Sequence, residues 1–363
     1  MKVAFVMSAR RIGGAEKNVL DFVSQAGRPE FDLSVIALRG KGSFHKHLAE
    51  QGAAVFDVRG PAGPVVPLAR VLRRTRPDIV HLFGARANAW GGLLGRSVGA
   101  RVVSAIMGAD PHPPWLKLLL NRSSGTLIDH WIANSEAGIG LVASQIGVSR
   151  DRISLIRNGV DIRRFAPPMD KTQAKRALGL SGDEPVVIQV ANLMPVKGHL
   201  RLMETIPELL ETAGPLQFLL VGEDYMGGAV QRRAAELGLN GRVRFTGRQQ
   251  DVVPFLAAAD VFVLPSLHEG LPTSAMEAMA VGLPVVASRV GGIPELVVDA
   301  ETGLLVDPDD PRSLAAALAG LLSGHSLASR FGSAGRKRIV EHFSLERMVR
   351  DQEECYREVL RRS

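Results

Sequence analysis

The sequence predicts an α/β protein made of two consecutive doubly wound units, each a parallel β-sheet covered by helices. Its 363 residues fit two domains of ordinary size better than one. Short runs rich in Val and Ile, typical of buried parallel strands, alternate with longer segments of helical periodicity. This alternation occurs twice, before and after a turn-rich segment that contains Pro167-Pro168, so two sheets are expected rather than one large sheet.

Six strands are predicted in each unit. They are KVAFVM, DLSVIAL, AAVFDV, DIVHLF, RVVSAI and HWIA in the first, and PVVIQVA, LQFLLVG, RVRFT, DVFVLP, PVVAS and GLLV in the second. Helices such as 15–25 and 199–210 lie between strands. A linker is expected at 162–170, because the two prolines continue neither a helix nor a central strand. The predicted domains are 1–165 and 166–344, and a final helix at 345–363 is expected to pack back on the first domain.

Charge is distributed unevenly along the chain. The net charge is +7, yet residues 1–170 hold 23 Lys and Arg against 13 Asp and Glu. This excess predicts an anionic partner for the first half. Only one cysteine, Cys355, is present, which excludes an internal disulfide and fits a reducing compartment, so a cytoplasmic location is expected. Aromatic residues make up only 5% of the chain, which argues against a nucleic-acid reader.

The loop after DVFVLP is the richest candidate site. It reads SLHEGLPTSAMEAMAVG and leads into a helix whose first backbone N–H groups suit a phosphate. Glu269 and Glu277 flank this helix start and could accept hydrogen bonds from two ends of an extended ligand that carries hydroxyl pairs. The alternative is that Ser274 and Glu277 form a capping box that serves only the helix.

Other loops that follow strands supply further candidates, because ligands of open α/β sheets bind beyond the carboxyl ends of strands. Lys197 follows PVVIQVA and could pair with a diphosphate, or it could be a solvated turn lysine. Gly13-Gly14 follows the first strand and allows close backbone approach, although it is not a GxGxxG motif. Glu223 and Arg248 follow two further strands. The nine histidines form no metal-ligand spacing, so no metal is expected.

These loops together resemble the retaining glycosyltransferases of family 4, which have the GT-B fold of two facing Rossmann-like domains. The resemblance rests on motifs in order along nearly the whole chain: GGAE at 13–16, NGVD at 158–161, VKG at 196–198, HEGLPTSAMEAMAVGLPVVAS at 268–288 and GGIPEL at 291–296. Glu269 and Glu277 match the E-x7-E signature of that family.

The resemblance implies a role for each matched residue. Glu269 would hold sugar hydroxyls near the anomeric carbon, Glu277 the ribose, and Lys197 the diphosphate. Catalysis is predicted for Glu269 and Lys197 and, from its expected place in the cleft and not from the resemblance, for His81. The donor side would also include Gly13, Gly14, Asn192, Glu223, Arg248, Gly270, Leu271, Pro272 and Thr273. The substrate would be a nucleoside diphosphate sugar, with UDP favoured over GDP, and neither metal nor cofactor is expected. The acceptor would be a glycan or a lipid-linked saccharide of cell-surface polysaccharide or glycolipid synthesis.

Two positions depart from the pattern of the family. Asn192 stands where an arginine often lies beside the diphosphate, and Met107 stands where many members have a histidine on the acceptor side. His81 or Asp110 could line that side instead, together with Asn158 of the NGVD motif. For His81 the alternative is a structural histidine at the end of a strand.

The acceptor half has features that suit an anionic membrane surface. Arg70, Arg73 and Arg74 lie on one helical stripe, and PHPPWLKLLLNR at 111–122 combines apolar and basic groups. A solvated charged face and a core segment are the alternative interpretations. Two rival functions stay open: a nucleotide-sugar epimerase of the same fold, and a non-catalytic module that retains nucleotide-sugar binding but has lost turnover.

Overall fold

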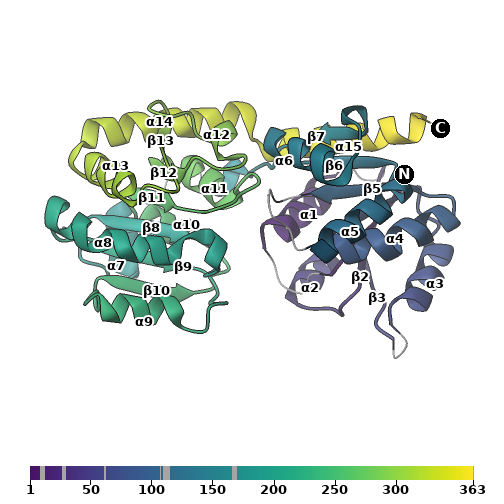
Figure 1. The fold of residues 1–363 in the computed structure, drawn as a ribbon, viewed down its shortest axis with the longest axis horizontal. Helices are drawn as coiled ribbons and strands as arrows, with labels where there is room; N and C mark the ends of the chain where they lie inside the picture. The colour runs from purple at the N-terminus through teal and green to yellow at the C-terminus, as the bar shows by residue number, and fades with distance from the viewer. Residues whose placement is uncertain are drawn as a thin grey trace. The chain divides into compact units, whose positions relative to one another are not determined.

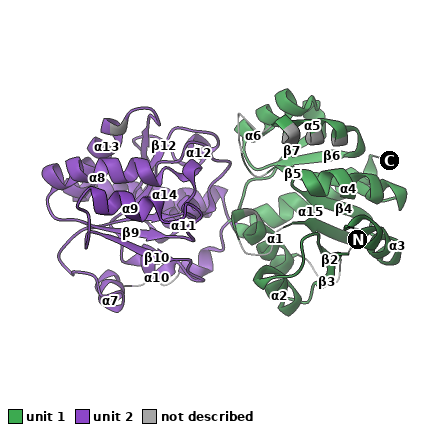
Figure 2. Ribbon diagram, turned by 60° about the horizontal axis from the view of Figure 1, so that its bottom comes forward, with its two compact units in different colours: residues 1–159, 345–363 green, residues 160–344 purple. Residues whose placement is uncertain are grey.

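The computed structural model describes residues 1–8, 13–26, 30–60, 63–106, 108, 115–165 and 170–362. The chain divides into two compact units: unit 1 comprises Met1–Gly159 and Leu345–Ser363, and unit 2 comprises Val160–Ser344. Figure 2 colours unit 1 green and unit 2 purple. Each unit has its own sheet and its own buried core, so each is described separately.

Unit 1 contains a parallel sheet with the order β3-β2-β1-β4-β5-β6-β7, and Figure 1 labels its strands β2, β3, β5, β6 and β7. Its strands are β1 (Lys2–Met7), β2 (Asp32–Ala37), β3 (Ala54–Asp57), β4 (Ile79–Phe83), β5 (Arg101–Ile106), β6 (His130–Ala133) and β7 (Ile153–Leu155). Its helices are α1 (Gly14–Gln25), α2 (Ser43–Glu50), α3 (Val65–Thr75), α4 (Ala85–Ser97), α5 (Trp115–Ser124), α6 (Glu136–Leu141) and α15 (Leu345–Arg361), with shorter helical turns η1 (Gly125–Leu127), η2 (Val142–Ile146) and η3 (Arg150–Arg152).

Unit 2 contains a parallel sheet with the order β10-β9-β8-β11-β12-β13. Its strands are β8 (Val186–Val190), β9 (Gln217–Val221), β10 (Val243–Gly247), β11 (Val261–Leu264), β12 (Val285–Ser288) and β13 (Gly303–Val306). Its helices are α7 (Lys171–Ala177), α8 (His199–Ala213), α9 (Ala229–Glu236), α10 (Val253–Ala257), α11 (Thr273–Val281), α12 (Ile293–Leu296), α13 (Pro311–Ser323) and α14 (His325–His342), with the turns η4 (Ile162–Phe165) and η5 (Pro195–Lys197).

Both sheets are doubly wound, as predicted. The strand order reverses between β1 and β4 in unit 1 and between β8 and β11 in unit 2, and such switch points are where ligands of open α/β sheets bind. All twelve predicted strands form. Unit 1 adds β7, a strand of three residues, which is too short to give a recognisable alternation in the sequence.

The division between the units falls at Gly159 and Val160, before the predicted boundary at residue 165. The Val160 amide donates to the Phe343 carbonyl oxygen at 2.9 Å, and Val160 pairs with Ser344 in an isolated parallel bridge. Val160 and Phe165 both belong to a core cluster of unit 2. The segment predicted as a linker therefore begins inside unit 2, because the side chain of Phe165 is buried there.

Helix α15 returns the chain to unit 1 and packs against α1. Its apolar stripe includes Met348 and Tyr356, which join the core cluster that also holds Phe22. The rings of Phe22 and Tyr356 lie edge to face with centroids 5.9 Å apart, a favourable geometry for aromatic pairs. In the described part of the chain, none of the helices is both long and apolar enough to cross a membrane.

Candidate functional site

Lys197 and Glu269 meet at the carboxyl edge of the unit 2 sheet. Lys197 ends η5, which follows β8, and Glu269 lies in the loop after β11. The Lys197 Nζ atom lies 2.7 Å from the Glu269 Oε1 atom, and the Ser266 hydroxyl donates to the same oxygen at 2.8 Å. The Glu269 side chain is 8% exposed and that of Lys197 26%. A buried carboxylate needs such compensation by a cation and hydrogen bonds.

Close backbone contact fixes these two loops against each other. The Leu267 amide donates to the Val196 carbonyl oxygen at 2.8 Å. Gly198 has φ of +71°, and a Cβ atom there would lie 1.9 Å from the Pro265 carbonyl oxygen. Only glycine tolerates both conditions. The glycine of the VKG motif therefore holds Lys197 where it reaches Glu269.

The GGIPEL motif supports Glu269 from the other side. Gly291 has φ of +52°, and a Cβ atom there would lie 1.9 Å from the Glu269 carbonyl oxygen. The Gly292 amide donates to that oxygen at 3.4 Å, and α12 begins at the next residue. The sequence identified this motif only by resemblance, whereas the structure gives a physical reason for its glycines.

Helix α11 (Thr273–Val281) starts three residues after Gly270. Pro272 is its N-cap residue, and no side-chain hydrogen bond caps the helix in the described structure. Ser274 lies within the first turn and not at the cap, so the capping box offered as the alternative role for Glu277 is not formed. Gly270, Leu271, Pro272 and Thr273 are all buried. The amide groups of this helix start are arranged as an anion site requires.

Glu277 lies inside α11 and pairs with an arginine. The Arg164 Nη1 atom lies 3.5 Å from the Glu277 Oε1 atom, and the Glu277 side chain is 8% exposed. Arg164 is in η4, within the segment that the sequence assigned to the linker. The contact joins residues separated by 113 positions, so no local pattern could have found it, and neither Arg164 nor Ser266 was among the predicted site residues.

Asn192 and Glu223 connect the loops after β8 and β9. The Glu223 amide donates to the Asn192 Oδ1 atom at 3.1 Å, and the Glu223 side chain accepts from the Tyr225 hydroxyl at 3.0 Å. Asn192 thus orders the neighbouring loop, a role that an arginine at this position could not fill in the same way. Arg248 is exposed after β10. The loops after β9 and β10 lie at the carboxyl edge of the unit 2 sheet, as does the loop that carries Lys197.

Gly13 and Gly14 begin α1 in unit 1, as predicted. The Gly13 amide donates to the Glu16 Oε2 atom at 2.9 Å, which caps the helix start. Burial raises the pKa of the Glu16 carboxyl. The GGAE motif therefore has a local structural role, since its glutamate closes the loop onto its own helix.

His81 and Asn158 lie in the interior of unit 1. His81 is 1% exposed, and its Nδ1 atom lies 2.7 Å from the Tyr356 hydroxyl. Burial lowers the pKa of His81 to about 3, so the ring is neutral near pH 7. Asn158 is 4% exposed and accepts from the Asn18 amide at 2.7 Å. Both line a cavity with about 20 Å³ of room, enough for a water molecule but not for a sugar.

This burial favours the structural interpretation of His81 over the catalytic one. A proton donor or acceptor must reach the reacting group, and α15 covers the His81 ring in unit 1. Met107 and Asp110, predicted on the acceptor side, lie outside the described residues. Among the residues that the structure describes, no group of three or more His, Cys, Asp or Glu side chains is placed to hold a metal ion.

Two family models match nearly the whole chain. Residues 12–164 match Glycosyltransferase Family 4, and residues 170–338 match Glycosyl transferases group 1. The chain belongs to glycosyltransferase family 4. The predicted resemblance is confirmed, and the protein is an enzyme of the glycosyltransferase type.

Curated relatives of this glycosyltransferase match it over most of their length. A GDP-mannose-dependent alpha-(1-6)-phosphatidylinositol monomannoside mannosyltransferase of Mycolicibacterium smegmatis is 33% identical over 350 residues, 90% of each chain. The lipopolysaccharide core biosynthesis glycosyltransferase LpsE of Rhizobium meliloti is 30% identical over 344 residues, covering 92% of this chain and 93% of LpsE. By name, the first is a phosphatidylinositol monomannoside mannosyltransferase and the second belongs to lipopolysaccharide core biosynthesis, so family membership does not choose between substrates.

A solved structure of Anabaena Alr3699/HepE in complex with UDP and glucose shares the fold. Its TM-score is 0.89 at 24% sequence identity, and the match covers 99% of this chain and all of that chain. A sucrose-phosphate synthase from Thermosynechococcus elongatus matches with a TM-score of 0.83 at 21% identity, over the full length of both chains. The predicted GT-B fold is thereby confirmed.

Proposed function

We propose that this glycosyltransferase moves a sugar from a nucleoside diphosphate sugar to a hydroxyl group of a glycan or lipid-linked saccharide, with retention at the anomeric carbon. The observation that carries the proposal is the contact between Lys197 and Glu269, 2.7 Å apart, beside the start of α11. A cation, a buried carboxylate and the amides of a helix start together suit a ligand that has both a diphosphate and hydroxyl groups.

Each group has a defined task in this proposal. Lys197 offers three N–H donors, so it can bind a diphosphate oxygen while it keeps Glu269 as a partner. Glu269 then directs its remaining acceptor capacity to the hydroxyls of the transferred sugar. The developing negative charge on the leaving diphosphate is stabilised by Lys197 and by the amides of α11.

The bonds balance without a protein nucleophile. The bond between the anomeric carbon and the phosphate oxygen breaks, and a new bond to the acceptor oxygen forms on the same face of the sugar. The acceptor hydroxyl gives its proton to the departing phosphate oxygen. This route, the usual proposal for the family, needs neither a metal nor an enzyme base, so His81 has no step to perform.

The printed names of a relative and of a solved structure support two nucleotide bases for the donor and do not choose between them. The relative from Mycolicibacterium smegmatis is GDP-mannose-dependent by name, whereas the Anabaena protein was solved with UDP and glucose. The sequence alone favoured uridine. We therefore propose a UDP-sugar or GDP-mannose as donor, and the first experiment compares the two.

Two rival functions are distinguished by product analysis. A nucleotide-sugar epimerase would release a free or altered sugar without an acceptor, and a non-catalytic module would bind the nucleotide without turnover. Transfer of the sugar to an acceptor would exclude both of them.

The first test is a thermal-shift panel of UDP, GDP and their sugars, with Lys197→Ala as the site variant. Lys171→Ala is the matched control, because Lys171 also forms a lysine–carboxylate pair in unit 2, at 2.8 Å from Asp260. One nucleotide series is expected to raise the Tm of the wild type and of the control, and to lose most of that shift in Lys197→Ala. If no nucleotide or nucleotide sugar raises the Tm of the wild type, the donor assignment is wrong.

We also propose that unit 1 contacts an anionic membrane surface when it meets a lipid-linked acceptor. Helices α4 and α5 pack together and expose large apolar side chains: Trp90 at 43%, Leu93 at 55%, Trp115 at 75% and Leu119 at 54%. Exposed aromatic and apolar groups on helices that also carry basic residues are typical of interfacial binding, and α4 and α5 carry Arg86, Arg96 and Arg122. Flotation with anionic liposomes at low salt tests this, and recovery of the protein only in the pellet would contradict it.

A further inference from the structure

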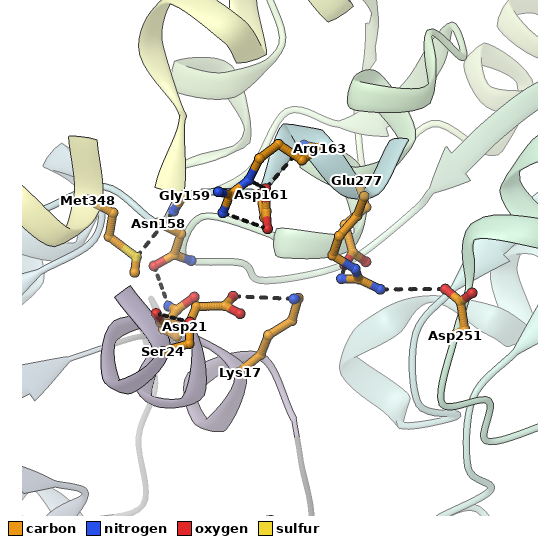
Figure 3. Close-up of polar contacts among 12 residues, drawn as sticks. Lys17, Asp21, Ser24, Asn158, Gly159, Asp161, Arg163, Asp251, Glu277 and Met348 are labelled. Atoms are coloured by element: carbon orange, nitrogen blue, oxygen red, sulfur yellow. Dashed lines mark hydrogen bonds and ion pairs between the residues drawn. The ribbon is translucent and has the colours of Figure 1, made fainter. Parts of the chain in front are cut away.

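Arg164 bridges two carboxylates that come from different loops of unit 2. Its Nη1 atom lies 3.5 Å from the Glu277 Oε1 atom, and its Nη2 atom lies 3.5 Å from the Asp251 Oδ1 atom. Glu277 belongs to α11, and Asp251 precedes α10. Figure 3 labels both carboxylates and draws the contact that reaches Asp251. The guanidinium is thus held at two ends.

The backbone that carries Arg164 is anchored in the core of unit 2. Phe165, the next residue, is 3% exposed, and η4 packs against α11. The Arg164 amide donates to the Asp161 carbonyl oxygen at 3.2 Å. With its backbone fixed in this way, the arginine loses less conformational freedom when its side chain is ordered.

The partner of Arg164 needs a cation more than an ordinary surface carboxylate does. The Glu277 side chain is only 8% exposed, while that of Arg164 is 35% exposed. A charge in such a position is costly unless it is paired, and the planar guanidinium of arginine fixes the orientation of a carboxylate better than a lysine does. Arg164 therefore limits the directions in which the Glu277 oxygens point.

We propose that Arg164 is a positioning residue for the nucleoside half of the donor: it holds the Glu277 carboxylate in the orientation that accepts the ribose hydroxyls, while Asp251 holds the guanidinium. This inference rests on the proposed function, in which Glu277 binds the ribose. Arg164 itself need not touch the ligand. Its effect is passed on through one carboxylate.

The neighbouring arginine provides a matched control. Arg163 pairs with Asp161, with its Nε atom 2.8 Å from the Asp161 Oδ1 atom, and its side chain is 65% exposed. Arg163→Gln and Arg164→Gln remove the same charge from adjacent positions of η4. Only the second removes the contacts with Glu277 and Asp251, so a difference between the variants reports on this bridge and not on the charge of η4.

The decisive readout is discrimination between ribose and deoxyribose. Isothermal titration measures the Kd of UDP and GDP, and of their 2′-deoxy counterparts, for the wild type, Arg164→Gln, Arg164→Lys, Arg163→Gln and Glu277→Gln. The wild type and Arg163→Gln are expected to prefer the ribonucleotide by about 10-fold, the effect of one hydrogen bond to a charged group. Arg164→Gln is expected to lose most of that preference, as Glu277→Gln does, and Arg164→Lys to retain part of it.

Different failures have different meanings. If the wild type binds neither UDP nor GDP, the proposed function fails. If the wild type binds one of them with a ribose preference that Arg164→Gln keeps in full, or if Arg164→Gln weakens both forms equally, Arg164 only supports packing and the inference is overturned. Should Arg164→Gln fail to fold, an unchanged preference in Arg164→Lys together with an unchanged preference in Asp251→Asn would overturn it as well.

Discussion

The two units share a topology but differ in the chemistry of the polar groups that their folds bring together. In unit 2, full charges meet near the carboxyl ends of the strands, at Lys197 with Glu269 and at Arg164 with Glu277. In unit 1, the groups that meet are His81 of β4 and Tyr356 of α15, both buried. Burial lowers the pKa of the His81 ring and raises that of the Tyr356 hydroxyl, so both stay neutral. The doubly wound fold brings polar groups together in both units. Burial by a covering helix keeps those of unit 1 neutral, whereas those of unit 2 are charged.

The largest effect is expected from Lys197→Ala. Removal of the cation beside Glu269 takes away electrostatic stabilisation of the leaving group, and the transfer rate with the best donor should fall by about 100- to 1000-fold. The measurement is an initial-rate assay with the donor found by the thermal-shift panel and a glycan or lipid-linked saccharide as acceptor. Lys171→Ala should remain within about 2-fold of the wild type, and an equal loss in both variants would remove the distinction between the two lysine pairs.

Acid should weaken unit 1 through its buried histidines. Burial lowers the pKa of His81 to about 3 and that of His130 to about 4, against about 6.5 in an unfolded chain. Below pH 6.5 each of these histidines binds a proton in the unfolded state, whereas in the folded state it stays neutral down to its lowered pKa. Stability is therefore present above pH 6.5 and is lost as the pH falls towards the folded values, by about 1.4 kcal/mol per pH unit for each histidine.

Tryptophan fluorescence makes this measurement specific to one unit. All three tryptophans, Trp90, Trp115 and Trp131, belong to unit 1. Urea unfolding followed by their emission at pH 7.0, 6.0 and 5.0 gives the slope. His81→Gln should reduce the slope by about 1.4 kcal/mol per pH unit, and a substitution of the exposed His325 should not change it. A slope that is identical in His81→Gln and the wild type would refute the assignment.

Tyr356→Phe should affect stability without affecting transfer. The Tyr356 hydroxyl contacts the His81 Nδ1 atom and accepts from the Gln352 amide, each at 2.7 Å. Its removal leaves buried polar atoms unpaired, which costs about 1–3 kcal/mol of the free energy of unfolding. The kcat of the folded variant should stay within about 2-fold of the wild type. A large fall in kcat at unchanged KM would instead restore His81 as a functional group.

The smallest effect is expected from charges of unit 2 that lie on its solvent-exposed surface. Arg233 pairs with Glu204 at 2.7 Å and with Glu236 at 3.0 Å, and all three side chains are at least one-third exposed. Exposed ion pairs of this kind contribute less than about 1 kcal/mol. Arg233→Gln should therefore leave both the transfer rate and the urea midpoint nearly unchanged, and a strong effect would show that charge in unit 2 matters regardless of burial.

Local patterns predicted the fold well because parallel strands leave a local trace. Buried runs such as PVVIQVA and DVFVLP are continuous and apolar, and turn residues bound them. β7 was not predicted, because a strand of three residues is too short to show a recognisable pattern of apolar and polar residues. The start of unit 2 at Val160 was not predicted, because Val160 is joined to unit 2 by a hydrogen bond to Phe343, a residue far along the chain.

The candidate site was predicted only in part, and for the same reason. The pairing of Lys197 with Glu269 agrees with the positions that the motifs suggested. The contact of Arg164 with Glu277 and the cover of Tyr356 over His81 span 113 and 275 positions, so they depend on tertiary packing and not on local pattern. His81 illustrates the limit: the sequence analysis placed it at the end of a strand, whereas it is the third of five residues in β4 and its ring contacts Tyr356 of α15.

The returning helix also makes unit 1 a discontinuous domain with unit 2 inserted into it. The chain leaves unit 1 at Gly159 and re-enters at Leu345, and the two ends of the insert are joined by the Val160–Ser344 bridge. Adjacent ends are the condition under which a domain can be excised or circularly permuted, so 160–344 should be separable as one piece. Unit 1 cannot be excised in one piece: a chain that stops before Leu345 lacks Met348 and Tyr356 of its core, and α1 loses its contact with α15 while it keeps that with α2. Truncation before Leu345 would thus destabilise unit 1, although most of that unit is formed by residues 1–159.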